Sequence, residues 1–170
     1  MIRVVTLDEY DQKHLEKFSK TLYASFGVGA EHTGDMKIPP STPEPMDAEK
    51  LVNELGKIRS FADDKILFLT SRKLKDRQLV SGVAPTQGWS KYGKDRAILS
   101  THGMKDLETA HKQVSRHALH HLGHLWELHH CLDPRCSMYP PWALTFGQGD
   151  AIFCTFCREK SEQKIRLATS

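Results

Sequence analysis

Three runs of apolar, mostly β-branched residues limit the folds open to this chain more than any other feature. They are "IRVVTL" (residues 2–7), "KILFLTS" (65–71) and "RAILST" (96–101). Each has the length and composition of a strand, and the second is apolar enough to be buried on both faces of a sheet. Because helical segments alternate with these runs, we expect an α/β fold with a mixed, mostly parallel twisted sheet. Gly103 separates the last run from a long helix that we expect to start near Lys105.

Two amphipathic helices are predicted before the second of these strands. The first lies within residues 8–26 and leads into a short strand near residues 28–32. The second starts after Asp47, a residue type that commonly caps helix N-termini. Between them, "IPPSTPEP" (38–45) has four prolines in eight residues and predicts an extended loop. Residues 72–95 are rich in turn-forming residues and leave room for one short strand.

The bulk composition fits one globular domain over residues 1–170, since 39% of the residues are hydrophobic and 26% are charged. The N-terminus does not resemble a signal peptide, and no apolar stretch approaches the roughly 20 residues of a membrane span. We therefore expect a cytoplasmic protein with no membrane partner. The net charge of +3, with Lys and Arg spread along the chain, argues against a nucleic-acid partner.

All four cysteines lie between residues 131 and 157, and two of them form "CTFC" (154–157). In a chain without an export signal, such a cluster favours zinc binding over two disulfides or unpaired core thiols.

Seven of the ten histidines lie within residues 111–130. His117, His120, His121 and His124 follow an i, i+3, i+4, i+7 spacing, which places them on one face of a helix. A pair at i, i+4 suits one zinc ion, whereas a solvated polar face is the alternative interpretation. The spacing alone does not choose between the pairs His117/His121 and His120/His124.

Residues 120–157 resemble the signature of the archaemetzincin family of zinc metallopeptidases, which reads HExxHxxGxxHC, then C-x4-C-x-M and later CxxC. The matching segments are "HHLGHLWELHHC", "CLDPRCSM" and "CTFC". The resemblance implies two zinc ions per chain and a methionine beneath the histidine site, at these positions: a catalytic-type zinc on His120, His124 and His130, a structural zinc on Cys131, Cys136, Cys154 and Cys157, and Met138 as the Met-turn residue.

The resemblance also implies hydrolysis of peptides, since three histidine ligands leave a position for water or substrate. The expected partner is a peptide or an unfolded protein segment. "RAILST" (96–101) would be the edge strand beside the cleft, where an extended peptide could add itself. Trp126, Tyr139 and Trp142 are candidates for the wall of a specificity pocket, with core packing as the alternative. The implied parts of the domain are a sheet with helices (1–103), a zinc helix (104–130) and a loop-rich, zinc-stapled C-terminal part (131–170).

His121 stands where the family keeps the glutamate that acts as general base. Loss of general acid–base help costs roughly 10² to 10⁴ in rate, so we expect peptide hydrolysis to be weak or absent. An imidazole with a pKa near 6.5 could act instead, although a nearby dication disfavours its protonated form. The alternatives are a pseudo-peptidase that binds peptides without cutting them and, less favoured, a zinc-stabilised nucleic-acid-binding module.

Glu127 replaces the family glycine at the end of the zinc helix. A glutamate favours continuation of the helix, which would point His130 away from the metal. His129 or Glu127 would then be stand-in ligands. A further hypothesis has Glu127 supply the missing catalytic carboxylate, with a surface role as the alternative.

Overall fold

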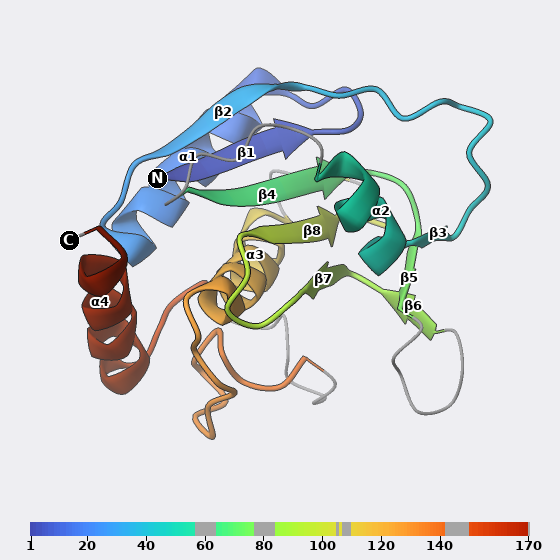
Figure 1. Cartoon of the computed structure of the whole chain (residues 1–170). Coiled ribbons are helices and arrows are strands. Elements are labelled where there is room, and N and C mark those ends of the chain that lie inside the picture. Colours follow the sequence, from blue (N-terminus) through green and yellow to red (C-terminus); the bar gives the residue numbers. More distant parts are fainter. Residues whose placement is uncertain (57–63, 77–83, 105, 107–109, 142–149, 170) are drawn as a thin grey trace.

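A five-stranded sheet forms the centre of the fold (Figure 1). The computed structural model describes residues 1–56, 64–76, 84–104, 106, 110–141 and 150–169. The strands, in spatial order, are β2 (Ala30–Asp35), β1 (Ile2–Thr6), β4 (Lys65–Thr70), β8 (Arg96–Ser100) and β7 (Gly88–Ser90). The first four run parallel and β7 runs antiparallel to β8. The expected mixed, mostly parallel sheet is confirmed.

The edge strand beside the histidine-rich helix is β7, and the prediction that residues 96–101 form that edge is wrong. Strand β8 lies between β4 and β7 and is paired on both sides. Its side chains are correspondingly buried from Ala97 to Ser100. The sequence predicts one short strand within residues 72–95 but does not place β7, which has only three residues, one of them glycine, and so carries no apolar run.

A second, three-stranded sheet extends from the carboxyl end of β4 (Figure 1). It consists of β3 (Met46–Asp47), β5 (Leu74–Asp76) and β6 (Ala84–Thr86), in the order β3-β5-β6. Residues 38–45 form no helix or strand, as the proline-rich sequence predicted.

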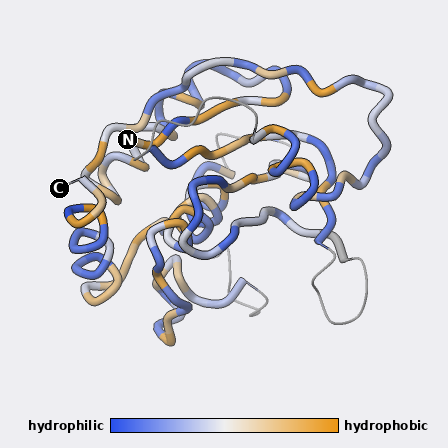
Figure 2. The backbone as a smooth tube through the Cα atoms, viewed as in Figure 1, coloured by the Kyte–Doolittle hydropathy of each residue, from blue (hydrophilic) through white to orange (hydrophobic). Residues whose placement is uncertain are grey.

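Helices cover both faces of the five-stranded sheet. Alternate strand side chains point to opposite faces, so the sheet has two hydrophobic cores. Helices α1 (Gln12–Phe26), α3 (His111–Leu125) and α4 (Thr155–Thr169) contribute to one core, and α2 (Ala48–Leu55) contributes to the other. Figure 2 shows hydrophobic residues along the central strands of the sheet.

Capping residues mark the start of α2 and the end of α1. Asp47 caps α2 as predicted, since its carboxylate accepts a hydrogen bond from the Lys50 backbone N–H. Helix α1 ends at Gly27, which has a φ of 67°. Helix α3 is shorter than the predicted zinc helix of residues 104–130: it begins at His111 and ends at Leu125. The predicted start at Lys105 lies outside the described residues.

Helix α4 begins at Thr155, so Cys157 lies in its first turn. In the part of the chain that the structure describes, no helix is long and apolar enough to cross a membrane.

Candidate metal centres

Helix α3 ends in a tight reversal at Glu127. This residue has a φ of 59°, in the left-handed region. The Glu127 N–H donates to the His124 carbonyl (3.1 Å) and the Leu128 N–H donates to the Gly123 carbonyl (2.9 Å), the two hydrogen bonds of a Schellman motif. The expected continuation of the helix through Glu127 is therefore wrong, because Glu127 adopts the conformation that the family glycine would supply.

This reversal brings three histidines together. One ring nitrogen from each of His120, His124 and His130 lies within 4.8 Å of the others. The Nε2 atoms of His120 and His124 are 3.1 Å apart. Of the two proposed stand-in ligands, His129 stacks on Tyr92 at a ring-centroid distance of 4.7 Å, and the Glu127 carboxylate pairs with Lys164.

Backbone carbonyls orient the first two imidazoles. The Nδ1 of His120 lies 2.9 Å from the Ser137 carbonyl, and the Nδ1 of His124 lies 2.8 Å from the Leu128 carbonyl. Because a carbonyl oxygen only accepts, each Nδ1 carries the proton, which leaves the lone pair on Nε2. Metal-binding histidines in proteins are commonly held in this way.

Burial keeps these imidazoles uncharged. It lowers the pKa of His124 to about 4 and the pKa of His120 well below 6.5, and it also lowers the pKa of the more exposed His130. At neutral pH the rings are therefore neutral and suited to binding a cation. Nitrogens bound tetrahedrally to zinc at about 2.0–2.1 Å lie about 3.3 Å apart, close to the 3.1 Å between the two Nε2 atoms. The residues present fit a zinc ion.

The four cysteines form a second group that fits a metal ion. Their sulfurs all lie within 4.8 Å of one another, and all four are free thiols rather than disulfides. The Cys131 and Cys154 sulfurs are 3.8 Å apart, the separation of about 3.8 Å expected for thiolates bound tetrahedrally at about 2.3 Å. Burial raises the pKa of Cys136 to about 11, so without a cation that thiol stays protonated.

Backbone N–H groups point at the cysteine sulfurs. Asp133 N lies 3.5 Å from Cys131 Sγ, and Met138 N and Cys154 N lie 3.5 and 3.4 Å from Cys136 Sγ. Donors in this arrangement favour the thiolate form that a metal requires.

Arg116 braces the loop that carries the cysteines, a role that the sequence did not reveal. Its side chain is 1% exposed, and its two terminal nitrogens donate four hydrogen bonds to backbone carbonyls. The acceptors are Pro134 (2.7 Å), Cys136 (3.0 Å), Arg135 (3.1 Å) and Asp150 (3.2 Å). The available signal was its position one turn before His120, on the same helical face.

Met138, the predicted Met-turn residue, is fully buried. A Cβ on Gly123 would overlap its sulfur, so Met138 packs directly against the backbone of α3. The Met138 carbonyl also accepts a hydrogen bond from Cys131 N–H (2.9 Å), which links this residue to the cysteine group.

His121 faces the edge strand β7. Its Nδ1 lies 3.0 Å from Ser90 Oγ, and a Cβ on Gly88 would come within 2.5 Å of its Nε2. The hydrogen bond therefore holds Nδ1 on β7, and the Nε2 side of the ring packs against Gly88. The side chain is buried, which lowers its pKa well below 6.5. Ser90 and Gly88 were not singled out from the sequence, because nothing local to β7 points to α3.

His117, Trp126 and Tyr139 are not members of either group of possible metal ligands. His117 is buried with a pKa lowered by that burial to about 4, and it belongs to neither group of possible metal ligands among the described residues. Trp126 is a core residue, since it is 5% exposed and packs against Phe26 at 4.6 Å. Tyr139 is half-buried, and Trp142 lies outside the described residues.

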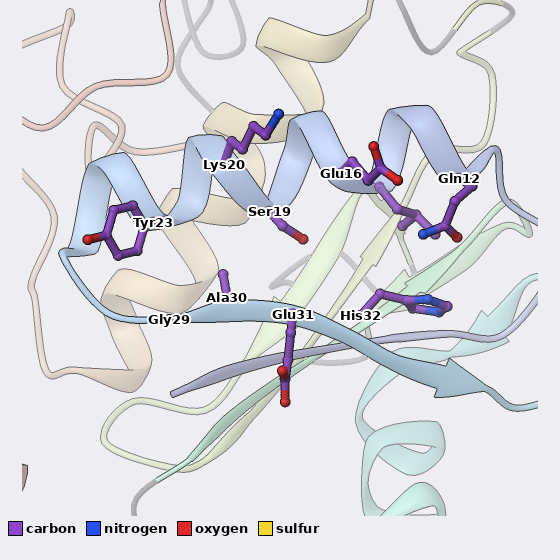
Figure 3. A pocket seen from close by; sticks show the side chains of 10 residues that line it. Gln12, Glu16, Ser19, Lys20, Tyr23, Gly29, Ala30, Glu31 and His32 are labelled. Carbon is purple, nitrogen blue, oxygen red and sulfur yellow. The ribbon is translucent and has the colours of Figure 1, made fainter.

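A cavity of about 580 Å³ lies between α1 and the opposite edge strand β2 (Figure 3). Glu16, Lys20 and Tyr23 line it from the helix, and Ala30 and His32 line it from the strand. None of the predicted metal ligands contributes to this cavity.

The chain is similar to known proteins over most of its length. A model of peptidase family M54 matches residues 34–163. In fold, the chain is similar to archaemetzincin from Methanopyrus kandleri (TM-score 0.80, 20% identity, 97% of this chain and 94% of that chain covered). It is also similar to a zinc-dependent peptidase from Methanocorpusculum labreanum (TM-score 0.75, 22% identity, 95% and 100% covered).

A third similar structure is archaemetzincin from Archaeoglobus fulgidus complexed with malonate (TM-score 0.71, 17% identity, 94% of this chain and 99% of that chain covered). None of the curated proteins matches the sequence.

Proposed function

Because the chain belongs to peptidase family M54, the archaemetzincin family, we propose that it binds zinc and extended peptide segments but hydrolyses peptide bonds weakly or not at all. The observation that carries this proposal is the attachment of His121 to β7, at the position where the family has its general base.

The two groups of side chains support two zinc ions per chain. His120, His124 and His130 would hold a zinc with a coordination position left for water or substrate, and the four cysteines would hold a structural zinc. When bound, the zinc on the histidines supplies a Lewis acid that polarises a water molecule or a peptide carbonyl.

His121 is poorly placed to act as a base. A general base must come within hydrogen-bonding distance of the proton that it removes. The Nδ1 atom of His121 is hydrogen-bonded to Ser90, and the Nε2 side of the ring packs against Gly88, so contacts with β7 set the orientation of the ring. Its role in the proposal is to fix the edge strand against α3, which fits peptide binding better than proton transfer.

Strand β7 supports the peptide-binding part of the proposal. Within the described part of the chain it pairs only with β8, so its other edge can form main-chain hydrogen bonds with an extended segment. The attachment through Ser90 and Gly88 keeps this edge close to the histidine group.

Replacement of His121 by glutamate tests the proposal. Wild type and His121→Glu are assayed for zinc content, for binding of a peptide library and for peptide cleavage, with His124→Ala as the control that lacks a histidine ligand. We expect two zinc ions per chain, peptide binding by wild type, and cleavage at least about 100-fold faster in His121→Glu.

The alternative, an active peptidase with His121 as its base, predicts the opposite order of rates. If wild type cleaves peptides and His121→Glu is slower, His121 is the base. A wild-type protein that holds only one zinc, with His124→Ala unchanged, would overturn the histidine site itself.

A further inference from the structure

The turn that carries His130 is made by a residue poorly suited to it. Glu127 has a φ of 59°, a conformation that side chains other than glycine, asparagine and aspartate rarely adopt. If Glu127 returned to a helical conformation, the chain would leave α3 in another direction and His130 would move away from His120 and His124. Contacts made elsewhere must therefore stabilise the turn.

Two of these contacts come from the β7–β8 hairpin. The Tyr92 hydroxyl donates to the Glu127 carbonyl (2.8 Å), and the Gly93 N–H donates to the His124 carbonyl (2.9 Å). The first hydrogen bond satisfies the Glu127 carbonyl, and the second adds to the one that the His124 carbonyl already accepts from the Glu127 N–H. These contacts hold the backbone but do not act on the glutamate side chain.

The third contact acts on that side chain and comes from α4. Lys164 forms an ion pair with the Glu127 carboxylate. This pairing also lowers the pKa of Glu127, so the carboxylate stays ionised. Lys164 follows Cys157 by two helical turns and precedes the buried Ile165, so the cysteine group and the core both fix its position.

We propose that Lys164 is a positioning residue for the histidine metal site: by pairing with Glu127 it holds the left-handed turn that places His130 beside His120 and His124. This inference rests on the proposed function, because it concerns the metal affinity of that site. It also gives Glu127 a role other than that of the missing catalytic carboxylate.

Loss of the Lys164–Glu127 ion pair should change the zinc affinity of the histidine site only modestly, because both side chains are partly exposed, at 35% for Lys164 and 45% for Glu127. Ion pairs of this kind change an equilibrium about two- to fivefold. The direction of the change in zinc affinity distinguishes a positioning role from a purely electrostatic one. Removal of a positive charge near a cation site should tighten metal binding by electrostatics alone, whereas loss of a positioning contact should weaken it.

A double-mutant cycle tests the inference. The zinc dissociation constant of the histidine site is measured by chelator competition, and the site is identified as the binding step that His124→Ala abolishes. We expect Lys164→Ala to weaken this step about two- to fivefold in the wild-type background. In a Glu127→Gly background, glycine holds the turn unaided, so Lys164→Ala should leave the dissociation constant unchanged.

Two control variants sharpen the result. Lys164→Arg keeps the ion pair and should keep wild-type affinity, and Lys160→Ala removes the same charge one turn earlier while leaving the Glu127–Lys164 pair in place. The inference is overturned if Lys164→Ala has the same effect in both backgrounds, or no effect in wild type. A wild-type protein without a histidine-site binding step would instead refute the proposed function.

Discussion

Replacement of Arg116 by methionine should destabilise the protein more than any other single change of a charged residue on α3. The side chain is 1% exposed, and its hydrogen bonds connect α3 to the segment 134–136 and to Asp150. These acceptors precede Met138 and Cys154, so one guanidinium holds both halves of the cysteine-bearing region. Methionine fills similar volume but offers no donors, so each of the four carbonyls would lose a hydrogen bond, and the Cys136 carbonyl would keep the one from the Tyr139 N–H.

The expected loss in the free energy of unfolding follows from the hydrogen bonds that those carbonyls lose. A buried carbonyl left without a partner costs about 1–3 kcal/mol. Because the loop can relax and admit water to some carbonyls, we expect about 3–5 kcal/mol rather than the sum of four terms. For a chain of this size, that loss lowers Tm by roughly 6–20 °C.

The assay is thermal unfolding followed by circular dichroism, on samples matched in zinc content. Lys112→Met is the matched control, since it removes the same charge one turn earlier on α3. Lys112 forms an ion pair with Asp150 in which both side chains are well exposed, so its Tm should change by at most about 2 °C. Equal Tm changes in the two variants would refute the bracing role of Arg116.

Three further changes follow from the packing around the site. Gly123→Ala should lower the free energy of unfolding measured in urea, because the new methyl overlaps the Met138 sulfur. Overpacking costs about 1–3 kcal/mol, which exceeds the gain of about 1 kcal/mol in helix propensity. An increase in stability would show that Met138 can move aside. Cys157→Ser should reduce the zinc content from the proposed two ions to one and raise amide hydrogen exchange in α4; unchanged metal content would remove Cys157 from the ligand set. Phe26→Ala should cost about 3–5 kcal/mol in chemical denaturation, since its ring packs on Trp126 at 4.6 Å and on Phe153 at 5.2 Å; a cost below 1 kcal/mol would mean that the core collapses around the gap.

The central strands were predictable because their signal is local. The runs at 2–7, 65–71 and 96–101 are apolar enough to be recognised as strands from the sequence alone. Asp47 could be recognised as a helix cap because it bonds to a backbone group only three residues away. Strand β7 could not be placed within residues 72–95 because it has three residues and no apolar pattern. Its position at the edge depends on pairing with β8, which local sequence does not encode.

The turn at Glu127 shows why local preference failed at the site. Glutamate favours helix continuation, yet contacts from Tyr92, Gly93 and Lys164 act on this turn from distant parts of the chain. The grouping of His120 with His124 was open from spacing alone. The family resemblance selected that pair, the fold places the two rings together, and zinc binding by them stays a prediction.

Consecutive residues, His130 and Cys131, belong to the two different groups of possible ligands. Their Cα atoms are joined across one peptide unit of about 3.8 Å, too short a linker to absorb independent movement of the two side chains. If both groups hold zinc, the cysteine cluster is a rigid anchor, and His130 is the residue directly before its first ligand. Displacement of His130 by a bound substrate would then have to distort the cysteine site as well as the turn at Glu127. The cysteine site therefore restrains the geometry of the histidine site, although it does not contact the peptide.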